Sequence, residues 1–323
     1  MCLHADQIEC GRAGLKVSRL SVGAAPRVGF FSSVLDREVD ALVERAVDLG
    51  LTLLDTAPFC GSGHSETRLG KGLCKVLRGS SRLSSKVGRR FAPLETEEDA
   101  GYVDLDPFSP VYDYPASGIR RSFESSSERS VPDSIEIFHR HDPELHLDQA
   151  TNEALPTLDS MRSEELITSI GIGRNLSEIG TLSERKTVLD VALVADRCTL
   201  LDQVGLDEFL PEALRREVSV VGAGVFNSSV LKNPVEGATC NDEPAPQHII
   251  AKAQKPGDVI RSYEVSVAAV GFQFPLRHPA VKSILTDVRT VAELQINAEE
   301  FDTSIPDELW SDLESGGLMQ PLD

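Results

Sequence analysis

Short apolar runs alternate with longer segments of helical period along this chain. Two such runs, at 51–63 and 81–89, are rich in Leu, Thr and Ser and contain Pro or Gly near their ends. The segment between them, at 65–76, has the length of a short helix. Strand, helix and strand in this order predict a βαβ unit, because parallel neighbouring strands need a long connection between them.

The same alternation extends over the rest of the chain and is typical of an α/β protein. Residues 8–19 carry two turn glycines, which predict an N-terminal hairpin. Residues 91–115 show no clean period, so we expect a long loop there that covers the strand ends. Pro256 and Gly257 are expected to interrupt a late helix. Further strands are expected within 20–26, 135–143, 167–175, 189–203, 218–229 and 281–285, and further helices at 36–50, 117–129, 151–162 and 306–318.

Length, composition and charge fit a single domain over residues 1–323, with a hydrophobic content of 41%. The formal net charge of −19 argues against nucleic acids and anionic membranes as partners, since both need a basic surface. No apolar run approaches the ~18 residues of a membrane span. Residues 1–10 lack the pattern of a signal peptide, and the six cysteines lack metal-binding spacing. We therefore expect a cytoplasmic protein with reduced thiols and no metal.

Two polar residues stand where an apolar core would not place them. Asp55 and Lys86 lie near the ends of the two runs that form the predicted βαβ unit. In a parallel barrel such positions face the mouth, where active sites are built. We expect burial to lower the pKa of the Lys86 amine, and the Asp55 carboxylate to orient it, which would give a pair suited to handling protons.

The segment from Leu54 to Gly70, LDTAPFCGSGHSETRLG, followed by SSKVGR at 84–89, resembles the aldo-keto reductase family. The nearer likeness is to its D-threo-aldose and L-fucose (L-galactose) dehydrogenase branch, and it extends over essentially the whole chain. The resemblance implies a TIM (β/α)8 barrel with an N-terminal hairpin and a C-terminal helix. It also implies an oxidoreductase with NADP or NAD as cofactor and a small carbonyl or sugar substrate. The oligomeric state stays open.

The family uses a catalytic Asp, Tyr, Lys and His, and the resemblance carries three of these roles to Asp55, Lys86 and His141. His139 lies on the same predicted strand face, so it competes with His141 for the histidine role. At the position of the tyrosine, five residues after the aspartate, this chain has Cys60.

The resemblance also places the cofactor. Asn175 would hold the nicotinamide amide group, although Asn after a strand is also a common turn residue. Phe226 would stack on the nicotinamide and the backbone at Asn227 and Ser228 would receive the pyrophosphate, whereas the alternative for Phe226 is core packing. The adenosine end would meet three residues that recur every four positions, or that simply form a solvated helix face: Arg289, Glu293 and Asn297.

Cys60 determines how much of the family chemistry is expected. A free thiol has a pKa near 8.5, and we expect Lys86 to shift Cys60 toward a thiolate, which cannot donate a proton. We therefore expect reduced turnover, with His141 or a water bound to Lys86 as the acid. The alternatives are a non-catalytic nicotinamide-binding sensor or scaffold, and a protein in which Cys60 is an activated nucleophile.

Overall fold

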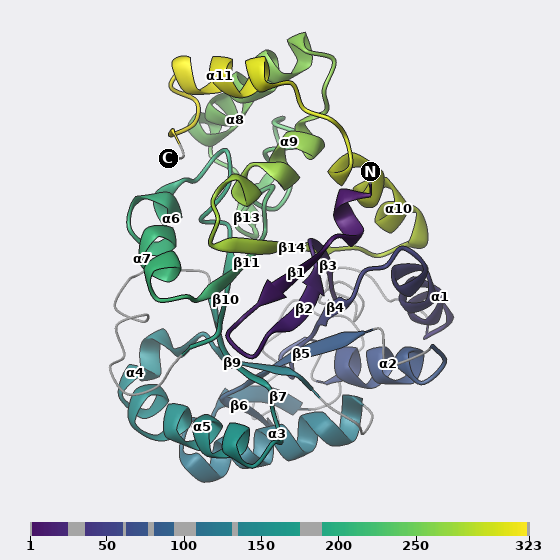
Figure 1. Ribbon diagram of the computed structural model, residues 1–323, viewed down its shortest axis with the longest axis vertical. Coiled ribbons are helices and arrows are strands. Elements are labelled where there is room, and N and C mark those ends of the chain that lie inside the picture. The colour runs from purple at the N-terminus through teal and green to yellow at the C-terminus, as the bar shows by residue number, and fades with distance from the viewer. Residues whose placement is uncertain are drawn as a thin grey trace.

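The computed structural model describes residues 2–24, 36–60, 63–76, 81–93, 108–130, 135–174 and 189–321. Parallel strands that follow one another along the chain form a closed barrel (Figure 1), in the order β10-β11-β14-β3-β4-β5-β8-β9. This confirms the expected (β/α)8 barrel. The barrel strands are β3 (Leu20–Gly23), β4 (Leu53–Asp55), β5 (Arg82–Val87), β8 (Ile137–His141), β9 (Ser169–Arg174), β10 (Val191–Ala195), β11 (Ser219–Ala223) and β14 (Val281–Asp287).

Helices surround the barrel, as the alternating pattern predicts (Figure 1). The first of them shows why these segments are helical: α1 buries Val39, Leu42, Val43 and Ala46 on one face and leaves charged residues on the other. The helices are α1 (Asp36–Asp48), α2 (His64–Leu73), α3 (Ala116–Ser130), α4 (Leu147–Gln149), α5 (Leu155–Ser163), α6 (Val204–Asp207), α7 (Phe209–Arg215), α8 (Gln247–Ser262), α9 (Val267–Gln273), α10 (Val291–Phe301) and α11 (Asp307–Ser315). None of the helices in these ranges has the length and apolar character that a membrane crossing requires.

An N-terminal hairpin closes one end of the barrel, called the floor below. Its strands β1 (Gln7–Cys10) and β2 (Leu15–Ser18) are antiparallel, and Figure 1 shows them in front of the barrel strands. Cys10, Leu15 and Val17 of the hairpin join a buried cluster with side chains from the barrel strands. The expected hairpin is therefore confirmed. Asp55 and Lys86 lie at the C-terminal ends of their strands, at the opposite end of the barrel, which is called the mouth.

Two local expectations were wrong. The segment 91–115 is not entirely loop, because β6 (Arg89–Pro93) pairs with β7 (Phe108–Tyr112) as an antiparallel hairpin. Its Pro110 is tolerated because a two-stranded ribbon has free edges, where a missing N–H removes no ladder bond.

The helix α8 runs without interruption through Pro256, which is buried in it. Packing of the buried face of α8 outweighs the cost of the proline there.

Candidate active site

The mouth of the barrel holds a buried ion pair. Nζ of Lys86 lies 2.7 Å from Oδ2 of Asp55 and donates a second hydrogen bond, of 2.9 Å, to the carbonyl of Thr56. The hydroxyl of Ser84 donates to the other oxygen of Asp55. Both side chains of the ion pair are about nine-tenths buried. The strand ends thus bring Asp55 and Lys86 together, as the sequence predicts.

The charge state of Lys86 differs from the expected one. Burial alone lowers the pKa of this amine, but the attraction of Asp55, the hydrogen bond to Asp55 and the charge of Asp142 raise it above its ordinary value. The expected lowering of the pKa is therefore wrong. Lys86 is therefore an ammonium at neutral pH, and two of its three N–H groups are used by Asp55 and Thr56.

Cys60 lies in a tight turn after β4, where its N–H donates to the carbonyl of Ala57 over 3.1 Å. Its side chain is buried against Ala57 and Phe59. Burial raises the pKa of the Cys60 thiol to about 12, and the attraction of Lys86 offsets only part of that rise. The expected thiolate is wrong, because desolvation outweighs the nearby charge. Cys60 is a neutral thiol, which removes the basis for an activated nucleophile.

The two histidines of β8 occupy different depths. Burial lowers the pKa of His139 to about 4, and its imidazole lies so close to Gly171 that a side chain there would overlap it. His141 lies two residues further along β8 than His139, at the strand end nearer the mouth. Burial, together with the positive charges of Lys86 and Arg89, holds its pKa well below the usual value. Its Nδ1 is buried and has no hydrogen-bond partner within the described residues. The other ring nitrogen, Nε2, lies 3.4 Å from Oδ2 of Asp142. A neutral imidazole can donate or accept a hydrogen bond at a substrate oxygen.

Two contacts besides that with Asp142 hold His141 in position. The hydroxyl of Tyr114 donates a hydrogen bond to its backbone carbonyl. Gly88 allows this approach, because its φ is +102° and a Cβ on it would overlap the Tyr114 ring. The ring of Phe59 meets the imidazole edge to face, with the centroids 5.9 Å apart.

Sequence reasoning missed a second cation at the mouth. The guanidinium of Arg89 lies 4.4 Å from the ring centre of Phe59 and 4.6 Å from that of Tyr112. Its Nη2 donates to Oδ2 of Asp142 over 2.7 Å, whereas its buried Nε has no partner within the parts of the chain that are described. We call Arg89, Phe59, Tyr112 and Asp142 the arginine box. The available signal was an arginine directly after a strand end, at the close of SSKVGR.

The residues expected around the nicotinamide and pyrophosphate follow β11. Phe226 packs edge to face on Phe272, with Nζ of Lys232 4.9 Å from its centre, so part of the ring serves the core. The side chain of Asn227 is buried and bound to Thr199 and to the carbonyl of Asp196. The backbone N–H of Asn227 donates to the carbonyl of Gly224, and the hydroxyl of Ser228 lies 3.2 Å from a carboxylate oxygen of Asp242.

Of the residues expected at the adenosine end, Arg289 directly precedes Thr290, the N-cap of α10, whereas Glu293 and Asn297 lie within that helix. The carboxylate of Glu293 accepts the backbone N–H of Arg289 over 2.7 Å. Asn297 turns inward and donates to the hydroxyl of Thr286 over 3.0 Å. Of the three expected side chains, Arg289 is the one that presents a positive charge. Asn175 lies outside the described residues.

Carboxylates surround the expected phosphate region. Burial, followed by the charges of Asp242, Asp202 and Asp287, outweighs the opposite effect of Arg197 and raises the pKa of Asp196 to about 7. Asp287 is the last residue of β14, and its carboxylate lies against Gly23, so that a Cβ on Gly23 would overlap it. Across the described residues, no group of three or more His, Cys, Asp or Glu side chains could hold a metal ion.

The two halves of the site fit a dinucleotide to different degrees. At the catalytic end, the ammonium of Lys86 and the unpaired buried Nδ1 of His141 suit a nicotinamide and a carbonyl oxygen. At the phosphate end, Arg289 offers a positive charge, but the N–H of Asn227 is already bonded to Gly224 and the neighbouring carboxylates weaken the binding of an anion.

Comparisons with known proteins point to one family. A family model described as "Aldo/keto reductase family" matches residues 22–316. The chain is 36% identical to a pyridoxal 4-dehydrogenase of Microbacterium luteolum, over 96% of each chain. It is 34% identical to a D-threo-aldose 1-dehydrogenase of a Pseudomonas species, over 95% of this chain and 96% of that one.

Among solved structures, an aldo-keto reductase from Bacillus halodurans in its holo form has a TM-score of 0.79 at 19% identity, with 99% of this chain and 98% of that chain covered. That likeness concerns the fold, and it agrees with the closed barrel. The match of the family model over nearly the whole chain, together with the buried ion pair at the mouth, leads to one conclusion: the chain belongs to the aldo/keto reductase family of NAD(P)-dependent oxidoreductases.

Proposed function

We propose that this protein interconverts a small aldehyde or sugar hemiacetal with the corresponding alcohol or lactone, at a rate limited by Cys60. The observation that carries the proposal is the buried contact of 2.7 Å between Lys86 and Asp55, beside the unpaired imidazole nitrogen of His141. A nicotinamide cofactor, when bound, supplies or accepts the hydride. The side chains at the mouth then have to bind the reacting oxygen and supply or remove one proton.

Lys86 provides the positive charge at the reacting oxygen. Two of its N–H groups are held by Asp55 and Thr56, and the third is available for a substrate oxygen or a water. The neutral imidazole of His141 orients the same oxygen from the other side. Because Lys86 stays an ammonium and Asp55 stays paired with it, the charge is fixed before substrate arrives, which stabilises negative charge that develops on oxygen.

Proton transfer to or from the reacting oxygen is the slow step that we propose. The Cys60 thiol is neutral, with its pKa raised to about 12, so it still carries a proton at pH 7. Its sulfur stands one bond beyond Cβ, however, several ångströms short of the reach of a phenol. We therefore propose that a water held by Lys86 or His141 transfers the proton. The loss of a well-placed general acid costs about 10²- to 10⁴-fold in rate.

We propose a substrate with several hydroxyl groups or a ring, and NAD rather than NADP as cofactor. The relatives named above are called pyridoxal and D-threo-aldose dehydrogenases, and the arginine box offers a guanidinium between two aromatic rings to such a molecule. NAD is favoured because the carboxylate of Glu293, bonded to the backbone N–H of Arg289, lies at the expected adenosine end and would repel a 2′-phosphate.

The second candidate function is a nicotinamide-binding sensor or scaffold without turnover, which the replacement of the expected tyrosine by Cys60 favours. One experiment separates the two. Cofactor binding is measured by fluorescence for the wild type, and NAD-linked turnover of aldoses and pyridoxal for the wild type and Cys60→Tyr. Slow turnover that rises in the variant supports the dehydrogenase. Tight cofactor binding with no turnover in either protein supports the sensor.

We also propose the cytoplasm as the location. All six cysteines are free thiols, three of them buried, which suits a reducing compartment. Fractionation of cells that express the tagged protein tests this.

A further inference from the structure

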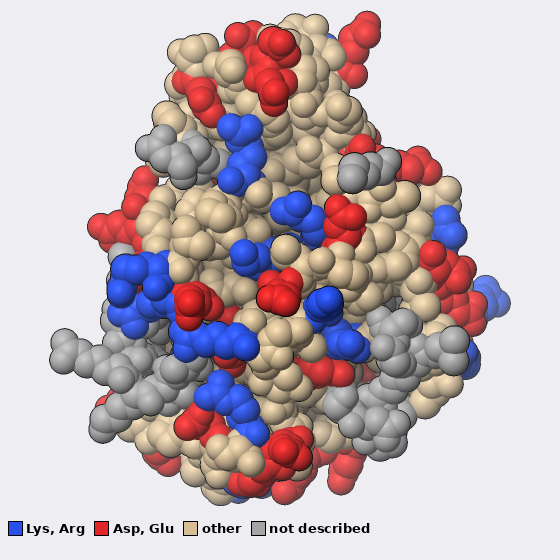
Figure 2. Space-filling model, in the orientation of Figure 1, with Lys and Arg blue, Asp and Glu red and all other residues tan. Residues whose placement is uncertain are grey.

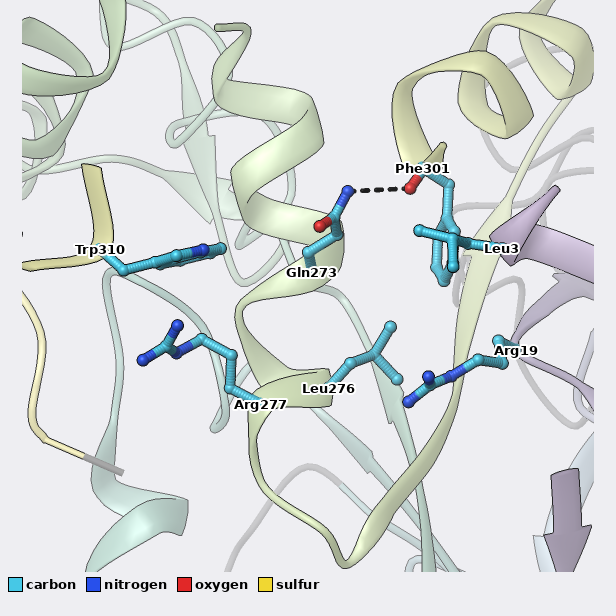
Figure 3. A pocket seen from close by; sticks show the side chains of 7 residues that line it. All are labelled: Leu3, Arg19, Gln273, Leu276, Arg277, Phe301 and Trp310. Carbon is cyan, nitrogen blue, oxygen red and sulfur yellow. Dashed lines mark hydrogen bonds between the residues drawn. The ribbon is translucent and has the colours of Figure 1, made fainter. Parts of the chain in front are cut away.

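A cavity of about 190 Å³ lies at the floor of the barrel, away from the catalytic mouth. Figure 3 shows its walls, which come from segments far apart in the sequence: the N-terminal turn, the residues before β3, the end of α9 with the 3-10 turn Pro275–Arg277, the end of α10, and α11. Arg19 precedes β3 and Arg277 precedes β14, whereas Lys86 stands near the other end of the strands. The cavity is therefore separate from the proposed substrate site.

Two arginines face this cavity, and they differ in how they are paired. Arg277 donates to a carboxylate oxygen of Glu314 over 3.1 Å, and its guanidinium lies 4.6 Å from the ring centre of Trp310. The Nε of Arg19 is buried and has no hydrogen-bond partner in the described part of the chain. Arg19 as a whole is half-buried, and a buried N–H without a partner is unfavourable, so this guanidinium suits an acceptor supplied from outside.

The remaining walls are apolar except for one amide. Leu3, Leu276 and Phe301 contribute side chains, and Figure 3 shows Leu276 between the two arginines. The amide nitrogen of Gln273 donates to the carbonyls of Phe301 and Thr303, over 2.9 and 2.7 Å. These two bonds fix the amide, so its oxygen remains as an acceptor at the cavity.

Charge and size together define the ligand class. The protein has a net charge of −19, yet Figure 2 shows several Lys and Arg side chains across the middle of the floor face, with acidic side chains both among them and toward the edges. Since an apolar protein cavity of about 150 Å³ can hold benzene, one of about 190 Å³ has room for a single ring with a small substituent.

We propose that the floor cavity is a binding site for a small aromatic carboxylate, with the carboxylate on Arg19 and the ring against Leu276, Phe301 and Trp310. Carboxylates pair well with guanidinium groups, whose N–H donors match both oxygens. A ligand there would join the N-terminal turn to α9, α10 and α11. Because it would bind the folded chain alone, it would also raise the temperature of unfolding. Neither effect depends on the proposed oxidoreductase function.

The fluorescence of Trp310 can report ligand binding at this cavity. Trp310 is the one tryptophan of the sequence, so fluorescence excited at its absorption edge comes from the cavity wall. The wild type is titrated with benzoate and, separately, with benzamide, which has the same ring but no charge. We expect a saturable change in fluorescence with benzoate and at least tenfold weaker binding of benzamide. No saturable change, or equal binding of both probes, would overturn the proposal.

Variants locate the site. Arg19→Met keeps the aliphatic length but removes the guanidinium, and we expect it to weaken benzoate binding at least tenfold. Arg12→Met is the matched control, because Arg12 lies in the floor hairpin near Glu217 and does not line the cavity. Thermal unfolding without ligand checks that both variants fold. Equal loss of benzoate binding in both variants, or loss in neither, would contradict the assignment to Arg19. If Arg19→Met does not fold, the comparison of benzoate with benzamide in the wild type still tests whether the cavity binds the carboxylate.

Discussion

The guanidinium of Arg89 lies 2.7 Å from the carboxylate of Asp142 and is held between two aromatic rings at the mouth of the barrel. This arrangement fixes a second positive charge just beyond the end of β5, the strand that carries Lys86, and the buried Nε of Arg89 has no partner among the described residues. A planar, fixed guanidinium of this kind recognises hydroxyl or carboxylate oxygens, and Lys cannot reproduce its geometry.

The arginine box therefore leads to a prediction for Arg89→Lys. We expect the variant to raise the KM for the best substrate about tenfold while kcat falls less, because one planar interaction with bound substrate is lost. Steady-state kinetics measures both constants. Arg90→Lys is the control, since Arg90 is exposed and lies 3.8 Å from Asp113 outside the box. A variant of Arg89 with unchanged KM would remove the box from substrate binding.

Two glycines of β9 provide a matched test of packing beneath the active site. A Cβ on Gly171 would overlap the imidazole of His139, whereas one on Gly173 would stand 3.4 Å from Cε of Lys86, an ordinary contact. We expect Gly171→Ala to lower the free energy of unfolding by about 1–3 kcal/mol, the usual cost of overpacking. Gly173→Ala should change it much less. Urea unfolding of both variants measures this, and equal effects would contradict the depth assigned to His139.

The buried histidine His139 predicts how stability depends on pH. Its pKa is about 4 in the folded chain and near 6.5 in the unfolded chain, so between these values the unfolded state binds the extra proton. Its contribution to stability is therefore present above pH 6.5 and is lost as the pH falls toward 4, at up to about 1.4 kcal/mol per pH unit. Urea unfolding at pH 7 and 5 measures the slope. A His139→Gln variant with the same slope would show that other groups cause it.

The Cys60 thiol should react slowly in the folded protein. With its pKa raised to about 12 by burial, only a small fraction is thiolate at pH 8. We expect iodoacetamide to modify the exposed Cys2 and Cys74 first, and Cys60 at a rate at least ten times lower. Mass spectrometry of peptides at timed intervals measures the order. Preferential modification of Cys60 would restore the activated nucleophile that the structure argues against.

The sequence allowed the barrel, its floor hairpin and the meeting of Asp55 with Lys86 to be predicted, because strand ends of successive βα units must share one rim. It did not allow the charge states to be predicted. The pKa of Cys60 depends on how completely its turn is buried, and that of Lys86 on the balance of burial against Asp55. No periodicity encodes either quantity.

The arginine box was missed for a related reason. Arg89 and Tyr112 are partners in the hairpin of β6 and β7, and this pairing joins residues separated by a stretch of irregular composition. Likewise, the inward turn of Asn297 toward Thr286 follows from the way α10 packs on β14, which a spacing of four residues cannot reveal.

The proposed reaction requires a mouth that binds NAD, and Cys60 is the weak part of the catalytic end of that mouth. The most direct measurement is the turnover number of Cys60→Tyr relative to the wild type, under saturating NAD and with a panel of aldoses and pyridoxal. The phenol would stand beside an ammonium that lowers its pKa and would restore the proton donor, so we predict a rise of about 10²- to 10⁴-fold. A folded variant that binds NAD but turns over no faster than the wild type would contradict this account.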